Sequence, residues 1–127
     1  MINDGKKKEA DILIVDDVES DLLKLKEVVK NTGYKVRTAA RGDEAIAMAR
    51  IKCPDLILLD ITMPDMNGID ALKRIRIIDP DAKIVICSAL GQHEMVAKAI
   101  EFGAQDFIVK PFQESRLVAA VKKVLSQ

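Results

Sequence analysis

Five short apolar segments divide the chain, and four of them are continuous rather than alternating. They are Ile12–Val15, Val36–Ala40, Leu56–Leu59, Ile84–Cys87 and Phe107–Val109. Continuous apolar runs of this length are typical of strands that are covered on both faces of a sheet. The pattern therefore predicts a sheet that is buried between two layers.

The segments between these runs have helical spacing. Three of the expected helices are marked by apolar residues three or four positions apart: Leu22, Leu25 and Val29; Val96, Ala99 and Ile100; Leu117, Val121 and Val124. Gly33 and Gly103 lie where helices are expected to stop and suit a left-handed cap, and Pro80 ends the third helix. A strand–helix unit repeated five times favours a parallel sheet with helices on both sides and right-handed crossovers.

Composition narrows the class of protein. The 127 residues suit one domain, about half of them are apolar, and Lys plus Arg (20) equals Asp plus Glu (20). No net field favours nucleic acid or an anionic membrane, and no apolar run approaches the roughly 18 residues of a membrane span. We expect a cytoplasmic protein with a flexible segment at residues 1–10, a domain at residues 11–127, and two reduced, buried thiols at Cys53 and Cys87.

Polar side chains end four of the five expected strands. The first strand ends in Asp16 and Asp17, the third in Asp60, the fourth in Ser88 and the fifth in Lys110. Ligands of open α/β sheets bind beyond the carboxyl ends of the strands. We therefore expect these side chains to share one site.

Carboxylates that converge in one place repel each other unless a cation lies among them, and an all-oxygen set suits Mg²⁺. Zinc is disfavoured because His93 is the single histidine and lies on an expected helix. The ammonium of Lys110 complements a phosphate, and Ser88 adds a hydroxyl donor. Together these groups indicate phosphoryl transfer to a carboxylate nucleophile, Asp60.

Each of these residues also has a simpler interpretation. Asp16 and Asp17 could be a favourable acidic pair at a helix start, and Asp60 could only end a strand. Ser88 could cap the next helix, and Lys110 could be a solvated loop lysine. The functional interpretation depends on their coincidence at one sheet edge.

The chain resembles the receiver domains of two-component response regulators, and in particular the stand-alone, chemotaxis (CheY-like) type. The resemblance is carried by Ile12–Asp17, Leu59–Gly68, Cys87–Ala89 and Asp106–Phe112, which span nearly the whole chain. It implies a flavodoxin-like sheet of five parallel strands in the order 2-1-3-4-5, with five helices on both faces. This strand order follows from the resemblance and not from the apolar pattern.

The resemblance also implies roles for the site residues. Asp60 would accept a phosphoryl group from a phosphohistidine. Asp17, Asp60 and the main-chain oxygen of Thr62 would bind Mg²⁺ directly, and Asp16 would bind it through a water. Mn²⁺ would be able to replace Mg²⁺.

Further roles concern the response to phosphorylation. Lys110, before a cis Lys110–Pro111 bond, would pair with the phosphate, and Ser88 would donate to it. Phe107 would be the switch aromatic that turns inward when Ser88 moves, and partners would detect the change on the fourth helix, fifth strand and fifth helix. Phe107 lacks the hydroxyl of the chemotaxis type, and Ser88 replaces the common Thr. Thr62 and Leu90 would border the path of attacking water.

The expected partners are a sensor histidine kinase or phosphotransfer protein and an unidentified downstream effector, with no nucleic acid or membrane bound. We expect a monomer or weak dimer that is not an enzyme, beyond its own phosphorylation and dephosphorylation. One alternative is a receiver domain cut from a larger DNA-binding or hybrid-kinase protein. Another is an aspartyl-phosphate phosphatase, although Thr62 stands where haloacid-dehalogenase-like enzymes need a second Asp. A third, a flavin or nucleotide binder, would need a phosphate loop where Asp16 and Asp17 stand.

Overall fold

All five apolar segments form parallel strands of one sheet in a computed structural model that describes residues 10–63 and 65–127. The strands are β1 (Asp11–Val15), β2 (Lys35–Ala39), β3 (Leu56–Asp60), β4 (Ile84–Ala89) and β5 (Asp106–Lys110). Their order is β2-β1-β3-β4-β5, which confirms the predicted topology. Residues 1–9 of the expected flexible segment (residues 1–10) lie outside the described residues, so the predicted boundary stays a prediction.

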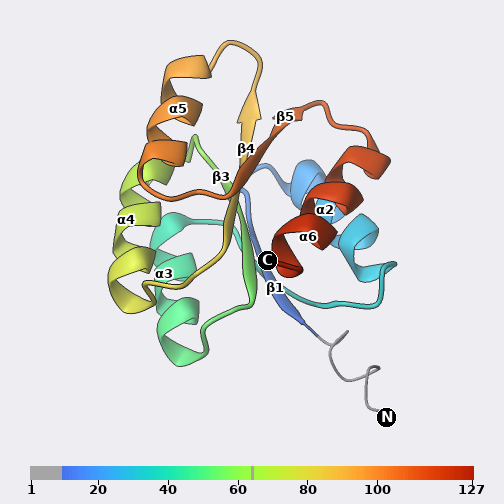
Figure 1. The fold of residues 1–127 in the computed structure, drawn as a ribbon, viewed down its shortest axis with the longest axis horizontal. Coiled ribbons are helices and arrows are strands. Elements are labelled where there is room, and N and C mark those ends of the chain that lie inside the picture. The colour runs from blue at the N-terminus through green and yellow to red at the C-terminus, as the bar shows by residue number, and fades with distance from the viewer. Residues whose placement is uncertain (1–9, 64) are drawn as a thin grey trace.

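A helix follows each strand, and the helices cover both faces of the sheet (Figure 1). They are α2 (Glu19–Lys30), α3 (Gly42–Ile51), α4 (Gly68–Ile78), α5 (His93–Glu101) and α6 (Glu114–Leu125). Helices α3, α4 and α5 lie on one face, and α2 and α6 lie on the other. None of the helices in the described part of the chain is long and apolar enough to cross a membrane.

Alternate strand residues supply two separate cores. On β1, Leu13 and Val15 pack toward the three-helix face, whereas Ile12 and Ile14 pack toward the two-helix face. Successive side chains of a strand point to opposite faces, so a strand between two helical layers needs an apolar residue at every position. This is the physical reason for the continuous apolar runs in the sequence.

The local stop signals behave as predicted. Gly33 and Gly103 follow α2 and α5 with φ angles of 97° and 107°, a left-handed conformation that favours glycine. Helix α4 ends at Ile78, shortly before Pro80. The side chain of Asn67 caps the start of α4 by accepting a hydrogen bond of 2.7 Å from the N–H of Ile69.

Gly68 lets α4 begin directly beside the end of β3. A Cβ atom at this position would lie 2.6 Å from the Cα of Ile61 and 2.7 Å from the carbonyl oxygen of Asp60. The N–H of Gly68 also donates to the carbonyl of Ile61 at 2.7 Å. The close approach leaves no room for a side chain and fixes the backbone that follows Asp60.

A separate ion pair lies at the opposite end of the sheet. The carboxylate of Asp11 is buried, and the guanidinium of Arg37 on β2 approaches both of its oxygens, at 2.8 and 3.1 Å. Arg37 also donates to the carbonyl of Lys52 at 2.8 Å. The arginine offsets part of the cost of burying the carboxylate and ties the first two strands to the end of α3.

Candidate functional site

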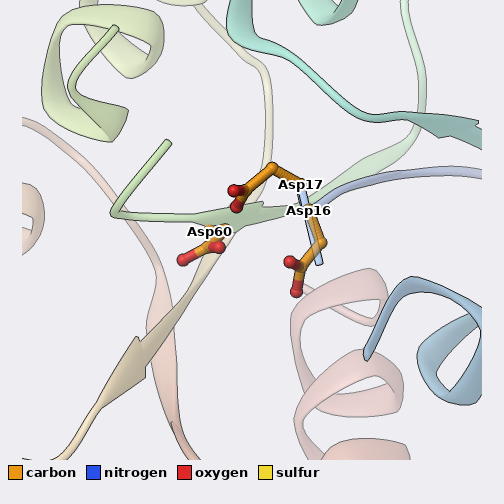
Figure 2. Close-up of side chains that lie close together, drawn as sticks. All are labelled: Asp16, Asp17 and Asp60. Atoms are coloured by element: carbon orange, nitrogen blue, oxygen red, sulfur yellow. The ribbon is translucent and has the colours of Figure 1, made fainter. Parts of the chain in front are cut away.

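Three carboxylates meet at the carboxyl ends of the two central strands, β1 and β3 (Figure 2). Asp16 and Asp17 directly follow β1, and Asp60 is the last residue of β3. The two strands are neighbours, with Val15 paired to Leu59. One oxygen of each aspartate lies within 4.8 Å of the others; Asp16 and Asp60 are buried, and Asp17 is exposed. The predicted convergence is confirmed.

This donor set fits a hard divalent cation. All three groups are carboxylates, and the exposed Asp17 leaves one side of the cluster open to water and to a ligand. Among the described residues, these aspartates are the one group of three or more histidine, cysteine or acidic side chains whose ligand atoms lie close enough to hold a metal ion. Asp16, Asp17 and Asp60 could therefore hold the ion; their individual roles as ligands stay predictions.

Lys110, the last residue of β5, reaches this cluster from the edge of the sheet. Its ammonium lies 2.6 Å from Asp16, 3.2 Å from Asp21 and 3.6 Å from Asp60, measured to the Oδ2 atom of each. The alternative of a solvated loop lysine is thus wrong. The Lys110–Pro111 peptide is cis, as predicted.

Burial shifts the ionisation of the central pair. Burial raises the pKa of Asp60 to about 6; the charge of Lys110 opposes this rise and that of Asp16 adds to it. Burial alone would lower the pKa of Lys110, but the hydrogen bond that its ammonium donates to Asp16 and the charge of Asp60 outweigh burial and raise that pKa above its usual range. Lys110 is thus a cation at neutral pH, and its charge favours the ionised form of Asp60.

Thr62 and Ser88 contribute polar groups beside Asp60. The N–H of Thr62 donates to Oδ1 of Asp60 at 3.2 Å. Ser88 lies within β4 and is almost fully buried, and its hydroxyl has no hydrogen-bond partner among the described residues. Helix α5 begins at His93 with Gln92 at the cap position, so Ser88 is not the helix cap of the simpler interpretation. A buried hydroxyl without a hydrogen bond costs free energy of folding. The donor of Ser88 is therefore available to a ligand that enters the site.

Phe107 on β5 is 38% exposed, so its ring lies outward in this structure. Beside it is a cavity of about 180 Å³ lined by residues of the β4–α5 segment and β5, among them Ser88, Gln92, Val96, Phe107 and Val109. The lining brings the expected switch residues, Ser88 and Phe107, to one cavity. Their movement stays a prediction.

Three side chains near the site escaped the sequence analysis. Asp21 on α2 contacts Lys110, and its position in the acidic first turn of a helix after β1 was the only local signal. Gln92 bridges Thr62 and Ala89 with two hydrogen bonds of 2.7 Å, and nothing in the sequence marked it. Asp65 accepts hydrogen bonds from the N–H groups of Gly42 and Asp43, which open α3.

Two other expectations have clear outcomes. Both cysteines are free, but Cys53 is exposed, so the prediction that it is buried is wrong. It follows the end of α3, where Ile51 is also exposed, and apolar neighbours in sequence did not produce an apolar environment. His93 is exposed on the first turn of α5, as predicted.

Comparisons with known proteins agree with this geometry. The family model described as "Response regulator receiver domain" matches residues 12–122. The chain is 53% identical to "Chemotaxis protein CheY" of Thermotoga maritima, over 89% of this chain and 95% of the relative. It is 40% identical to "Sporulation initiation phosphotransferase F" of Bacillus subtilis, over 90% and 92%. The crystal structure of the receiver domain of NtrX from Brucella abortus matches with a TM-score of 0.89 and 32% identity, over 91% of this chain and 98% of that one.

Proposed function

The chain belongs to the response regulator receiver domain family, and we propose that it is a switch controlled by phosphorylation of Asp60. One arrangement carries this proposal: three carboxylates lie together at the strand ends, with a lysine ammonium 3.6 Å from Asp60. A lysine beside a cluster of acids is suited to a site that receives an anionic group and a divalent cation together.

Asp17, Asp60 and the main-chain oxygen of Thr62 would hold Mg²⁺, or Mn²⁺ in its place, with Asp16 acting through a water. Bound there, the cation would neutralise negative charge on the phosphoryl group and on the acceptor. By bringing positive charge to the cluster, it would also lower the pKa of Asp60 from about 6 and favour the nucleophilic carboxylate.

In the proposed transfer, a carboxylate oxygen of Asp60 attacks the phosphorus of a phosphohistidine. The new O–P bond forms as the P–N bond breaks, and the leaving imidazole keeps the electron pair and takes a proton from solvent. Lys110 balances the charge of the phosphoryl oxygens, and the hydroxyl of Ser88 donates to one of them. That hydroxyl is buried and has no hydrogen-bond partner in the described part of the chain, so its donor is free for this bond.

The output of the switch is a change in protein binding. When Ser88 moves toward the phosphate, the cavity beside it would admit the ring of Phe107, which is now 38% exposed. The affected surface is that of α5, β5 and α6, the fourth helix, fifth strand and fifth helix of the chain. A partner that prefers one ring position would then distinguish the phosphorylated chain from the free one.

The proposed phosphodonor is a sensor histidine kinase or a phosphotransfer protein. The proposed downstream partner is a protein effector. Similarity to a chemotaxis protein and to a sporulation phosphotransferase supports a place in chemotaxis or in a phosphorelay. We propose that the chain catalyses only its own phosphorylation and dephosphorylation. A cytoplasmic location and a monomeric or weakly dimeric state stay predictions.

The proposal is tested with acetyl phosphate and Mg²⁺, followed by intact-mass measurement. The wild type should gain one phosphoryl group that hydroxylamine removes, and Asp60→Asn should gain none. Asp70→Asn, a change at an exposed aspartate in the first turn of α4, is the matched control and should be phosphorylated like the wild type. An unchanged mass of the wild type, under conditions in which a known receiver domain reacts, would refute the proposal.

A further inference from the structure

The side chain of Gln92 joins two segments that border the acceptor site. Its Nε2 donates to Oγ1 of Thr62 at 2.7 Å, and its Oε1 accepts from the N–H of Ala89 at 2.7 Å. Thr62 lies two residues beyond Asp60, and Ala89 directly follows Ser88. One carboxamide therefore spans the gap between the chain after β3 and the end of β4.

Sheet geometry shows where the N–H of Ala89 points. The last hydrogen bond between these strands runs from the N–H of Ile61 to the carbonyl of Cys87, at 3.1 Å. In a parallel ladder, alternate residues of a strand bond to the same neighbour, so Ala89, two residues beyond Cys87, directs its N–H toward the β3 side. Strand β3 has already ended at Asp60, and this donor has no β3 carbonyl to meet.

The N–H of Ala89 is therefore a backbone donor on the side of β4 that faces the acceptor strand. Backbone N–H groups at strand ends are suited to bind anionic oxygens. Asp60 pairs with Cys87 in the sheet register, so a phosphoryl group on Asp60 would extend over the part of β4 that includes Ser88 and Ala89. In the free chain, this N–H donates its hydrogen bond to Oε1 of Gln92.

We propose that Gln92 is a latch on the acceptor site, a positioning residue that holds the unphosphorylated conformation. This inference rests on the proposed function and deepens it. The carboxamide oxygen stands in for a phosphoryl oxygen at the N–H of Ala89, and the same group ties Thr62 to the start of α5. Phosphorylation must displace it, so the latch opposes the phosphorylated state.

The latch also links the acceptor to the surface that signals. Gln92 is the residue before the first turn of α5, and it lines the cavity that Phe107 also lines. Its release frees the segment between Ser88 and α5, which is the segment that must move before the ring of Phe107 enters the cavity. The side chain thereby couples the anion at Asp60 to the position of α5.

Beryllofluoride, which forms a phosphate-like adduct on aspartate in the presence of Mg²⁺, provides the test. Gln92→Met keeps the length of the side chain and removes both hydrogen bonds. Because a net hydrogen bond at such a site changes an equilibrium by roughly a factor of two to ten, Gln92→Met should bind beryllofluoride about two to ten times more tightly by titration calorimetry. The matched control is Gln113→Met, since Gln113 also precedes a helix but makes no capping bond.

A second readout is hydrogen exchange at the N–H of Ala89. In the free chain, this amide should exchange on the order of ten times faster in Gln92→Met than in the wild type or Gln113→Met. With beryllofluoride bound, the N–H of Ala89 should be protected equally in the wild type and in both variants, because it then donates a hydrogen bond to the adduct. A purely structural role for Gln92 would not produce this convergence.

The outcomes separate the latch from the function on which it rests. Equal or weaker beryllofluoride binding by Gln92→Met, with normal binding by the wild type, would overturn the latch alone. Unchanged exchange of Ala89 in the free Gln92→Met chain would also overturn it. If the wild type does not bind beryllofluoride with Mg²⁺, the proposed function fails and the latch fails with it.

Discussion

The Nζ atom of Lys110 lies 2.6 Å from Oδ2 of Asp16, whereas it lies 3.6 Å from Oδ2 of Asp60. In the metal-free chain, the lysine is thus paired most closely with an acid of the expected metal site. Asp21 also contacts the same ammonium, at 3.2 Å. A divalent cation that enters the cluster therefore meets a positive charge already in place, which suggests competition between the two cations.

Lys110→Ala should therefore tighten Mg²⁺ binding, and not merely leave it intact. Removal of a unit positive charge about 4 Å from a divalent cation favours the cation by about 2 kcal/mol even at the dielectric constant of water, so we expect binding to tighten by roughly tenfold or more. Titration calorimetry of the two chains with Mg²⁺ measures the change. Lys122→Ala, at an exposed lysine of α6, serves as the control, and equal affinities of all three chains would contradict the competition.

Asp17→Asn should weaken Mg²⁺ binding while it leaves the fold intact. The carboxylate of Asp17 is exposed, so its neutralisation removes a ligand charge without burying an unpaired group. We expect a loss of affinity on the order of tenfold or more. The calorimetric titration used for Lys110→Ala applies here, and normal affinity would refute the predicted ligand role of Asp17.

The raised pKa of Asp60 makes a prediction about stability and pH. The pKa rises from 3.8 to about 6 on folding, so the folded chain holds a proton that the unfolded chain has already lost in this range. This contribution to stability is fully present below pH 4 and is lost as the pH rises through 6. Without metal at about pH 8, Asp60→Asn should then be about 2–3 kcal/mol more stable than the wild type, since a rise of about two in the pKa of Asp60 corresponds to about that free energy.

Urea unfolding with a chelator present measures this difference. The gain should shrink steadily as the pH falls from about 8 toward about 4, because folded Asp60 takes up its proton below about pH 6 while the unfolded group, with a pKa of 3.8, is still partly ionised at about pH 4. A gain that does not change with pH would show that the substitution acts through packing and not through the charge.

Gly68→Ala should both destabilise the chain and weaken Mg²⁺ binding. The added methyl would overlap the backbone at Ile61 and Asp60, which costs roughly 1–3 kcal/mol when the core must adjust. Gly33→Ala is the matched control: its φ of 97° gives a backbone cost of about 1–2 kcal/mol, but no atom lies within 4 Å of the new methyl. Chemical denaturation and Mg²⁺ titration of both variants separate the effects, because only Gly68→Ala should change the affinity for the metal.

The two thiols should differ strongly in reactivity. Cys53 is exposed, whereas Cys87 is buried and burial raises its pKa to about 12. At about pH 8 we expect one thiol of the native chain to react readily with a disulfide reagent and the second to react on the order of a thousand times more slowly. In denaturant, both should react at once, and two fast thiols in the native chain would contradict the structure.

The sequence predicted most of the sheet and the central part of the site, because both depend on local information. Apolar runs identify strands that are buried on both faces, and the polar residue that ends each run must then lie at one edge. Asp16, Asp17, Asp60 and Lys110 were found in this way, and the structure brings them together.

Side chains that reach from one element to another were not predictable from local patterns. Asp21 and Gln92 contact the site only because α2 and the β4–α5 segment fold back toward it, and neither residue ends a strand. Cys53 was predicted to be buried because its neighbours in sequence are apolar. Its exposure depends instead on the end of α3, where Ile51 is 85% exposed.

The order of the strands also divides the molecule by rigidity. The acceptor is on β3, which has a strand on each side, whereas Lys110 and Phe107 are on β5, which pairs only with β4 among the described strands. Edge strands open locally at lower free energy than central ones. In the proposed switch, the acceptor would thus lie on the part of the sheet that deforms least, and the signal would be carried by an edge strand that can rearrange without global unfolding.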